Sequence, residues 1–322
     1  MPKVDIRSYV KINLSIDAGP RGADGYHTVD MVMQQLAFHD DVEVEYTPSA
    51  PGPSDAPGAA SHDKGGSFDI EVRTNRYYLP VDRRNLAYRA AELMISAAGE
   101  RAVPGKICID IKKRIPVAGG LAGGSGNGAA VIHALNILWD LHLSLRELMD
   151  IGAGLGSDVP FCVMGQARTD KAVPEYLKKD PMASSCARAA GRGTELTPVR
   201  PLKSWMVIAK PRFSVSTKEV YSGIDDMEIT RRPDNDRLVR ALSEGRKDYE
   251  DFVNVLEEYT LKKYPEVASL KGYMDEAGAE ISLMSGSGPT VFGIFGTMDA
   301  AKKAADKIQG RGLEAYWTRT TL

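Results

Sequence analysis

The chain has few of the features that mark secreted, zinc-binding or nucleic-acid-binding proteins. Its 322 residues include only three cysteines, Cys108, Cys162 and Cys186, which stand far apart. An odd number of isolated cysteines supports neither a disulfide framework nor a zinc site. The formal net charge is only −2. The charge therefore gives no electrostatic case for nucleic acid or for an anionic membrane as a partner.

Long apolar runs are absent as well. No run reaches the length of a transmembrane helix, and the N-terminal stretch MPKVDIRSYVKINLSID lacks the apolar centre of a signal peptide. The 43% hydrophobic and 26% charged residues are typical of a soluble globular protein. We therefore expect a reduced, cytoplasmic protein, long enough for one large or two ordinary domains.

The apolar pattern predicts an α+β fold. A period of two marks strands and a period near 3.6 marks helices. Strands are expected at residues 4–17, 40–46, 68–74, 106–112, 281–284 and 290–295. Helices are expected at 85–98, after the glycine-rich stretch, at 144–156, around 235–263 and at 299–308. Ser144 and Glu147 form a capping box at the start of one of them.

Two segments interrupt this pattern. Residues 47–66 are rich in proline and glycine with almost no large apolar side chain, which predicts a flexible insertion. Residues 168–187 are polar and irregular, so we expect a second flexible insertion there. The stretch SWMVIAKP (204–211) begins a new set of elements. We therefore expect an N-terminal domain at 1–200 and a C-terminal domain at 201–322.

The most informative stretch is IPVAGGLAGGSGNGAAVIHALNILW, residues 115–139. Its glycines let the backbone adopt positive φ and approach a ligand closely. Asn127 is a plausible helix cap by its residue type, and apolar residues then recur with helical spacing. A glycine loop that leads into a helix N-terminus is an anion site, because free N–H groups and the helix dipole both favour negative charge. We expect a phosphate here and call residues 116–126 the phosphate loop.

Several kinds of glycine loop remain open at this point. A Walker loop requires lysine where Ser125 stands. A dinucleotide fingerprint can be traced over Gly124, Gly126 and Ala129, but the nearest expected strand ends well upstream. A plain glycine-rich turn between strand and helix is the structural alternative. Two glycine pairs, a serine and no lysine favour a third type of phosphate loop.

Three shorter stretches also carry reactive or flexible residues. YVKINLSI places Lys11 and Asn13 on the same side of a strand, because side chains alternate along it. GLGSDVPF (154–161) presents Asp158 at a tight turn. LMSGSGPTVFGIF (283–295) is a second glycine loop between apolar segments. Each of these stretches alone is weak evidence for a functional site, since a lone lysine is usually solvated and an aspartate often forms turns.

Together and in this order, these motifs resemble the signatures of the GHMP small-molecule kinases. DGYHTVD (24–30) and NLAYRAAELM (85–94) are similar to the branch that acts on a cytidine-diphosphate-linked sugar alcohol, the methylerythritol conjugate of the non-mevalonate isoprenoid pathway. The resemblance runs from about residue 5 to the C-terminus. It implies a two-domain fold, with an N-terminal domain like domain 2 of ribosomal protein S5 and a ferredoxin-like C-terminal domain.

The resemblance also implies a reaction: ATP-dependent phosphorylation of the 2-hydroxyl of the sugar alcohol. Lys11 and Asp158 correspond to the catalytic pair. A carboxylate within hydrogen-bond reach can accept the proton of an alcohol as it attacks the γ-phosphorus. The lysine would stabilise the negative charge on the aspartate and on the transferred group. ATP and Mg²⁺ are the implied cosubstrate and cofactor.

Further residues receive roles by the same resemblance. The nucleotide would be bound by Pro116, Val117, Ala118, Gly119, Gly120, Leu121, Ala122, Gly123, Gly124, Ser125, Gly126 and Asn85, with Ser125 also a Mg²⁺ ligand. The substrate would be bound by Asn13, Tyr26, His27 and Tyr221, with the two tyrosines on either side of the cytosine and His27 at its edge.

The chain departs from the family pattern in places. Gly126 stands where a second serine is common, GRGTEL (191–196) is one residue longer than the usual turn, and 168–187 enters just before it. Three alternatives stay open: another GHMP kinase of the mevalonate or homoserine type, a nucleotide-binding regulator of the same fold, and a dinucleotide oxidoreductase. His133 and His142 do not suggest a metal site.

Overall fold

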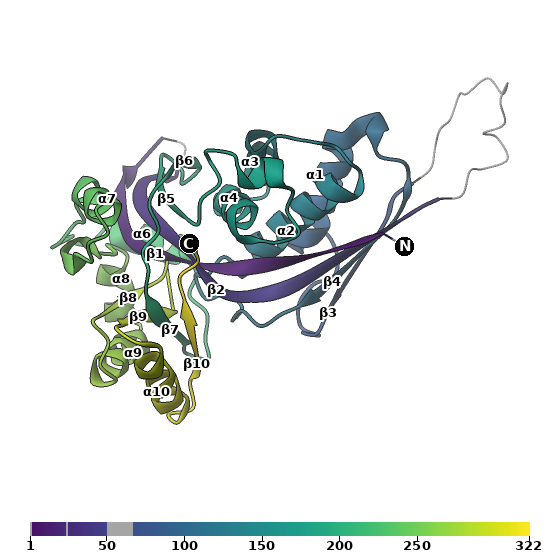
Figure 1. Cartoon of the computed structure of the whole chain (residues 1–322). Helices are drawn as coiled ribbons and strands as arrows, with labels where there is room; N and C mark the ends of the chain where they lie inside the picture. Colours follow the sequence, from purple (N-terminus) through teal and green to yellow (C-terminus); the bar gives the residue numbers. More distant parts are fainter. Residues whose placement is uncertain (1, 24, 50–66) are drawn as a thin grey trace, which may run out of the picture.

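The computed structural model describes residues 2–23, 25–49 and 67–322. Two sheets organise this part of the chain, a six-stranded sheet in the N-terminal half and a four-stranded sheet in the C-terminal half (Figure 1). The expected α+β character is confirmed. Residues 50–66, most of the insertion predicted at 47–66, lie outside the described residues.

Two long antiparallel strands form the backbone of the first sheet. β1 and β2 pair from Lys3↔Glu45 to Arg21↔His27, with shifts of register near Lys11 and Asn13. The far edge of β2 pairs first with β5 and then with β4, giving the order β3-β4-β2-β5-β6. The strands are β1 (Lys3–Arg21), β2 (His27–Pro48), β3 (Asp69–Thr74), β4 (Gly105–Lys112), β5 (Cys186–Ala190) and β6 (Glu195–Pro198).

Helices cover one face of this sheet, with α2 at their centre (Figure 1). Every residue of α2 from Gly126 to Asn136 is buried, so its apolar run is a core segment rather than an amphipathic stripe. Small residues at its start allow close contact with β1 and with its helical neighbours. The helices of this half are α1 (Leu86–Ala98), α2 (Gly123–Leu138), α3 (Leu145–Ala153), α4 (Val159–Thr169) and α5 (Glu175–Lys178), with a 3₁₀ turn at Gly99–Arg101.

The second sheet is antiparallel with the order β10-β7-β9-β8, which is the strand order of a ferredoxin-like fold. Its strands are β7 (Trp205–Lys210), β8 (Ile281–Met284), β9 (Val291–Phe295) and β10 (Glu314–Arg319). The helices of this half are α6 (Thr217–Ile224), α7 (Asn235–Ser243), α8 (Glu257–Lys263), α9 (Pro265–Glu276) and α10 (Met298–Gln309), with a 3₁₀ turn at Tyr249–Asp251.

Two local predictions are corrected. Asn127 does not cap α2, because the helix begins four residues earlier, at Gly123, after Ala122 in a left-handed conformation (φ 54°). Residues 168–187 are not irregular throughout. They include the end of α4, the short helix α5 and the start of β5. Val173 and Leu177 are buried in the core, so a few well-placed apolar side chains anchor a segment whose composition is mostly polar.

Candidate active site

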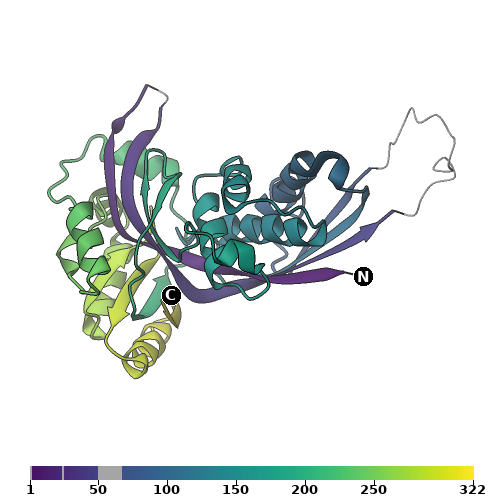
Figure 2. The ribbon, with the colours of Figure 1, turned by 45° about the horizontal axis from the view of Figure 1, so that its top comes forward.

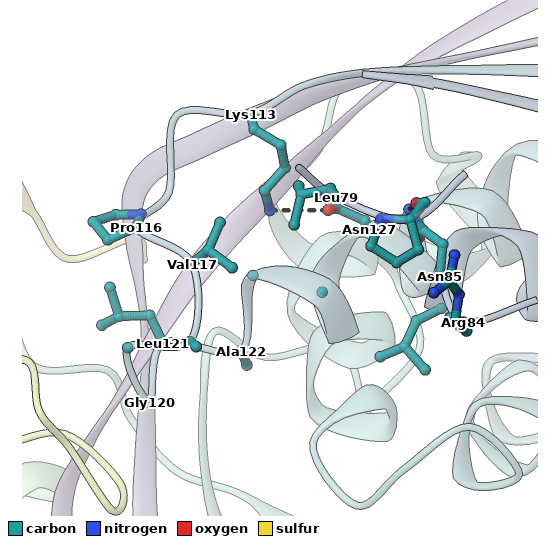
Figure 3. Close-up of a pocket in the computed structure, with 16 residues that line it drawn as sticks. Leu79, Arg84, Asn85, Lys113, Pro116, Val117, Gly120, Leu121, Ala122 and Asn127 are labelled. Atoms are coloured by element: carbon teal, nitrogen blue, oxygen red, sulfur yellow. Dashed lines mark hydrogen bonds between the residues drawn. The ribbon is translucent and has the colours of Figure 1, made fainter. Parts of the chain in front are cut away.

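The phosphate loop forms one wall of a pocket of about 290 Å³. The opposite wall is the segment from Leu79 to Leu86 that precedes and begins α1 (Figure 3). Positive φ at Ala118 and Gly120 turns the loop before α2 begins. The first N–H groups of a helix have no intrahelical acceptor, so those at the start of α2 remain available for an anion. The wall therefore combines a tight backbone turn with a helix N-terminus.

Backbone packing leaves no room for side chains at the turn of this loop. A Cβ at Gly120 would lie 2.3 Å from the carbonyl oxygen of Ser285, and the residue has φ +74°. The Ser285 hydroxyl also donates to the Gly120 carbonyl at 3.0 Å. The second glycine loop thus packs directly against the phosphate loop. Two glycine-rich motifs that are far apart in the sequence are therefore neighbours in the folded chain.

Lys11 and Asp158 form an ion pair beside the pocket. Lys11 Nζ lies 3.3 Å from Asp158 Oδ1, and the side chains are 6% and 32% exposed. The ammonium also donates to Asn13 Oδ1 at 3.0 Å, which fulfils the expectation that both residues share a face of β1. The Lys11 backbone N–H donates to the Leu121 carbonyl at 3.2 Å, so the pair is attached to the pocket wall. A buried cation next to a partly accessible carboxylate suits proton transfer beside this pocket.

Asp158 owes its accessibility to the local fold. It precedes α4 at the N-cap position, yet its side chain makes no capping hydrogen bond. Pro160 in the first turn of α4 lacks an N–H in any case and is well tolerated there. The carboxylate is therefore left for Lys11 and for a ligand.

Of the expected substrate residues, Tyr26 and His27 lie at the end of the β1–β2 hairpin (Figure 2), whereas Asn13 lies in the middle of β1 and Tyr221 on α6. His27 Nε2 is 2.6 Å from Asp225 Oδ1, and the His27 ring lies 5.4 Å from the ring of Tyr221. Burial raises the pKa of the Tyr221 hydroxyl to about 12, and the charge of Asp158 contributes to the shift. The pKa shift links Tyr221 electrostatically to the Lys11–Asp158 pair.

Tyr26 has different neighbours from Tyr221. Its side chain is on the surface, and the guanidinium of Arg192 lies 3.9 Å from the centre of its ring. Arg192 belongs to the GRGTEL turn, which the sequence marked as unusual. The sequence did not identify Arg192 or Asp225 as site residues. The unusual GRGTEL turn was a signal that pointed to the region of Arg192, whereas Asp225 belongs to no motif.

Three of the expected nucleotide-binding residues either use their side chain elsewhere or do not line the pocket. Asn85 lines the pocket, but its side chain caps α1 through Ala87 N and donates to the Pro80 carbonyl. Gly126 is buried and its N–H donates to the Ala122 carbonyl. Ser125 is half-buried on the first turn of α2 and does not line the pocket itself.

Among the described residues, no three or more His, Cys, Asp or Glu side chains are grouped so that they could hold a metal ion. His133 Nε2 contacts the Val163 carbonyl, and burial lowers its pKa, as expected for a neutral core histidine. His142 lies on the surface beside Asp140. In the same part of the chain, no helix is long and apolar enough to span a membrane.

Comparison with known proteins identifies the family. The chain matches the model of the GHMP kinases N-terminal domain over residues 85–166 and that of the GHMP kinases C-terminal domain over residues 227–313. The expected GHMP kinase fold is thereby confirmed. Among solved structures, a homoserine kinase from Cytophaga hutchinsonii shares this fold with a TM-score of 0.65 at 14% identity, covering 100% of this chain and 95% of its own.

More similar proteins narrow the assignment. A 4-diphosphocytidyl-2-C-methyl-D-erythritol kinase of Alkaliphilus metalliredigens is 39% identical over 96% of this chain and 93% of its own length. The enzyme of the same name from Geobacillus kaustophilus is 42% identical over 91% and 88%. A crystal structure of a 4-(cytidine 5'-diphospho)-2C-methyl-D-erythritol kinase matches with a TM-score of 0.75 and 27% identity over 99% of this chain and 100% of that one. The chain therefore belongs to the 4-diphosphocytidyl-2-C-methyl-D-erythritol kinase family of the GHMP kinases.

Proposed function

We propose that this protein transfers the γ-phosphoryl group of ATP to the 2-hydroxyl of 4-diphosphocytidyl-2-C-methyl-D-erythritol, a step of the non-mevalonate isoprenoid pathway. The observation that carries the proposal is the Lys11–Asp158 pair, with Nζ 3.3 Å from Oδ1, attached through Leu121 to the wall of the pocket of about 290 Å³. Family membership supports the same reaction. A dinucleotide oxidoreductase is excluded by the GHMP kinase fold.

Asp158 is the general base of this reaction. It accepts the proton of the 2-hydroxyl, whose oxygen attacks the γ-phosphorus as the bond to the bridging oxygen of ADP breaks. Lys11 stabilises the charge that develops on the transferred group. Its burial supports this role, because a cation held in place by Asn13 and Asp158 needs little reorganisation during the reaction.

ATP is bound with its phosphates against the phosphate loop and the N-terminus of α2. Glycines and the helix N–H groups replace the lysine of a Walker loop. Mg²⁺ would be held at this site by the Ser125 hydroxyl, whose oxygen is of the type that this ion prefers. When bound, it would neutralise charge on the phosphates. The position of Ser125 supports this role, because the residue is half-buried in the first turn of α2, next to the phosphate loop glycines.

The cytidine is recognised by side chains at the end of the β1–β2 hairpin and on α6. Tyr26 and Tyr221 provide aromatic surfaces for the base, and His27 lies at its edge. Asn13 contacts the diphosphate or the methylerythritol, and Asn85 contacts the nucleotide. The 2.6 Å contact between His27 Nε2 and Asp225 Oδ1 and the Arg192–Tyr26 contact support a site whose side chains are held in defined orientations.

We also propose that residues 1–200 form the ATP-binding domain and residues 201–322 the C-terminal domain. The six-stranded sheet takes its last strand from Glu195–Pro198, and the four-stranded sheet begins with Trp205–Lys210, which supports a division between them.

Release of ADP from ATP, followed with a coupled assay, tests this function. The cytidine-diphosphate conjugate of methylerythritol is compared with mevalonate and homoserine at equal concentrations. Turnover with the cytidine conjugate alone supports the proposal. Turnover with mevalonate or homoserine in its place, or ATP binding without turnover, would assign the protein to another kinase branch or to a regulatory role.

A further inference from the structure

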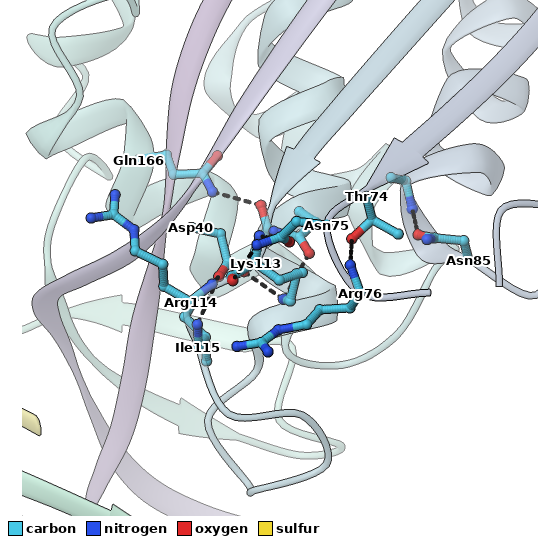
Figure 4. A network of polar contacts seen from close by, with 12 residues as sticks. Asp40, Thr74, Asn75, Arg76, Asn85, Lys113, Arg114, Ile115 and Gln166 are labelled. Atoms are coloured by element: carbon cyan, nitrogen blue, oxygen red, sulfur yellow. Dashed lines mark hydrogen bonds and ion pairs between the residues drawn. The ribbon is translucent and has the colours of Figure 1, made fainter. Parts of the chain in front are cut away.

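A buried charged cluster lies beneath the phosphate loop and is separate from the Lys11–Asp158 pair. It consists of Asp40 on β2 and Lys113 just after β4 (Figure 4), together with Asn127 on α2 (Figure 3). The Asp40 side chain is completely buried, and that of Lys113 is 6% exposed. Charges so far from water are costly unless they are paired and hydrogen-bonded, so this cluster requires a specific arrangement of the three elements.

The carboxylate of Asp40 contacts the chain on both sides of the phosphate loop. Its Oδ1 accepts hydrogen bonds from the backbone N–H groups of Arg114, at 2.6 Å, and Ile115, at 2.8 Å. Its Oδ2 accepts from Lys113 Nζ and, at 3.0 Å, from Asn127 Nδ2. Ile115 immediately precedes the phosphate loop and Asn127 immediately follows it. One side chain therefore fixes both ends of the loop.

Lys113 extends the same arrangement into the pocket wall. Its ammonium donates to Asn127 Oδ1 at 3.0 Å, and the residue lines the pocket (Figure 3). A Cβ added at Gly123 would lie 3.1 Å from this ammonium, so the charge is directly beneath the first turn of α2. Asn75 accepts from the Lys113 N–H at 2.8 Å and donates to its carbonyl at 3.2 Å, which holds the backbone as well.

We propose that Asp40 is a positioning residue for the phosphate loop: its carboxylate holds both ends of residues 116–126 in the geometry that binds the phosphates of ATP. The inference depends on the proposed function in placing ATP at this loop. Charge-assisted hydrogen bonds to backbone N–H groups are short and strong, and hence they suit this task. Lys113 balances the charge of Asp40 instead of acting as a free cation like the lysine of a Walker loop.

The test compares Asp40→Asn with Asp41→Asn. Asp41 is the next residue of β2, but its carboxylate is on the surface and pairs with the side chain of Arg114. Asparagine at position 40 keeps an acceptor for Arg114 N and Ile115 N but no longer neutralises Lys113 or accepts from Asn127. Calorimetry with a non-hydrolysable ATP analogue, well below the melting temperature of each variant, is expected to show a Kd raised about tenfold or more in Asp40→Asn. Asp41→Asn should bind like the wild type.

Comparing the KM for ATP with the KM for the alcohol distinguishes a positioning role of Asp40 from a general destabilisation of the fold. In Asp40→Asn the KM for ATP should rise while the KM for the alcohol and kcat at saturating ATP change by less than about threefold. The double variant Asp40→Asn/Asn127→Asp returns a carboxylate to Lys113 and should recover part of the ATP affinity. If Asp40→Asn does not fold, Asn127→Ala, which keeps the ion pair, should still weaken ATP binding by about threefold.

Wild-type ATP affinity in folded Asp40→Asn or Asn127→Ala would overturn the inference, as would equal weakening of both substrates. Failure of the wild-type protein to bind the ATP analogue at all would instead overturn the proposed function, so the two failures can be told apart.

Discussion

The two ends of the candidate active site are built in different ways. The phosphate end consists of backbone, fixed by buried contacts such as Asp40 with Lys113 and Ser285 with Gly120. The base end consists of side chains from two elements, the end of the β1–β2 hairpin and α6 with its C-cap Asp225; Tyr26 is 58% exposed and Asp225 37% exposed. Under the proposed function, the first end binds a group common to all ATP-dependent kinases, so its geometry can be rigid and general. The second end would supply the specificity of one branch through a few side chains.

This difference gives the two ends different sensitivities. Substitutions in the phosphate loop should disturb the fold and ATP binding together, because backbone groups pack against other backbone groups. Substitutions at the base end should alter one substrate and leave the fold intact. Asp158 lies where the two ends meet and should affect neither binding step.

The largest effect on turnover is expected from Asp158→Asn. An amide cannot accept the proton of the alcohol, so kcat should fall by about a hundredfold or more while both substrates still bind. Steady-state kinetics and ATP-analogue binding measure the two quantities separately. Near wild-type kcat in this variant would remove Asp158 from the mechanism.

A second prediction contrasts two glycines of the phosphate loop. Gly120→Ala forces a side chain into a left-handed conformation and against the Ser285 carbonyl, and should lower the free energy of unfolding by about 2 kcal/mol or more. Gly124→Ala meets only the Leu86 side chain at 3.6 Å and should cost much less. Thermal and urea denaturation of both proteins provide the measurement. Equal stabilities would show that the packing of the two glycine loops is not what restricts position 120.

At the base end, Tyr26→Ala should weaken binding of the cytidine substrate by about 1–3 kcal/mol, the range for stacking of a base on an aromatic ring. ATP affinity and melting temperature should not change, because this side chain is on the surface and far along the hairpin from the pocket wall. Calorimetric titration with each ligand tests this. Loss of both affinities together would argue against two separately built ends.

The smallest effect is expected from Asp225→Asn. His27 would lose a charged partner but keep its ring contact with Tyr221, so the KM for the cytidine substrate should rise only several-fold, about 1 kcal/mol. The matched variant Asp226→Asn changes the adjacent acidic residue, which makes no ion pair with His27. Identical kinetics of the two variants would mean that Asp225 does not orient His27.

The sequence indicated the local geometry of the phosphate end, because its signals lie in short stretches of the chain. The positions where only glycine fits and the alternation of β1 that brings Lys11 beside Asn13 are both visible in short stretches. The α+β fold class followed from the same kind of periodicity. Even here, the start of α2 was misplaced by the residue type of Asn127, which binds Lys113 and Asp40 instead of capping the helix.

The remaining parts of the fold and of the candidate site depend on contacts between residues that are far apart in the sequence, and no local sequence pattern reveals such contacts. Asp40 is separated from Lys113 by 73 residues, and His27 from Asp225 by 198. An aspartate in a strand or a helix C-terminus has many ordinary explanations, so neither residue could be recognised before the chain was folded. The short helix α5 was missed for a related reason, since only its buried Leu177 distinguishes it from a polar loop.

The most direct test of the account is a competition between the cytidine- and uridine-diphosphate conjugates of methylerythritol for one preparation of the enzyme. Cytosine offers an exocyclic amine donor and a ring nitrogen acceptor, and uracil reverses both. A site that pairs with the first pattern leaves buried polar atoms unpaired with the second, at about 1–3 kcal/mol for each group. The account predicts that kcat/KM favours the cytidine conjugate by about tenfold or more. Equal use of the two conjugates would contradict a base-reading end formed by Tyr26, His27 and Tyr221.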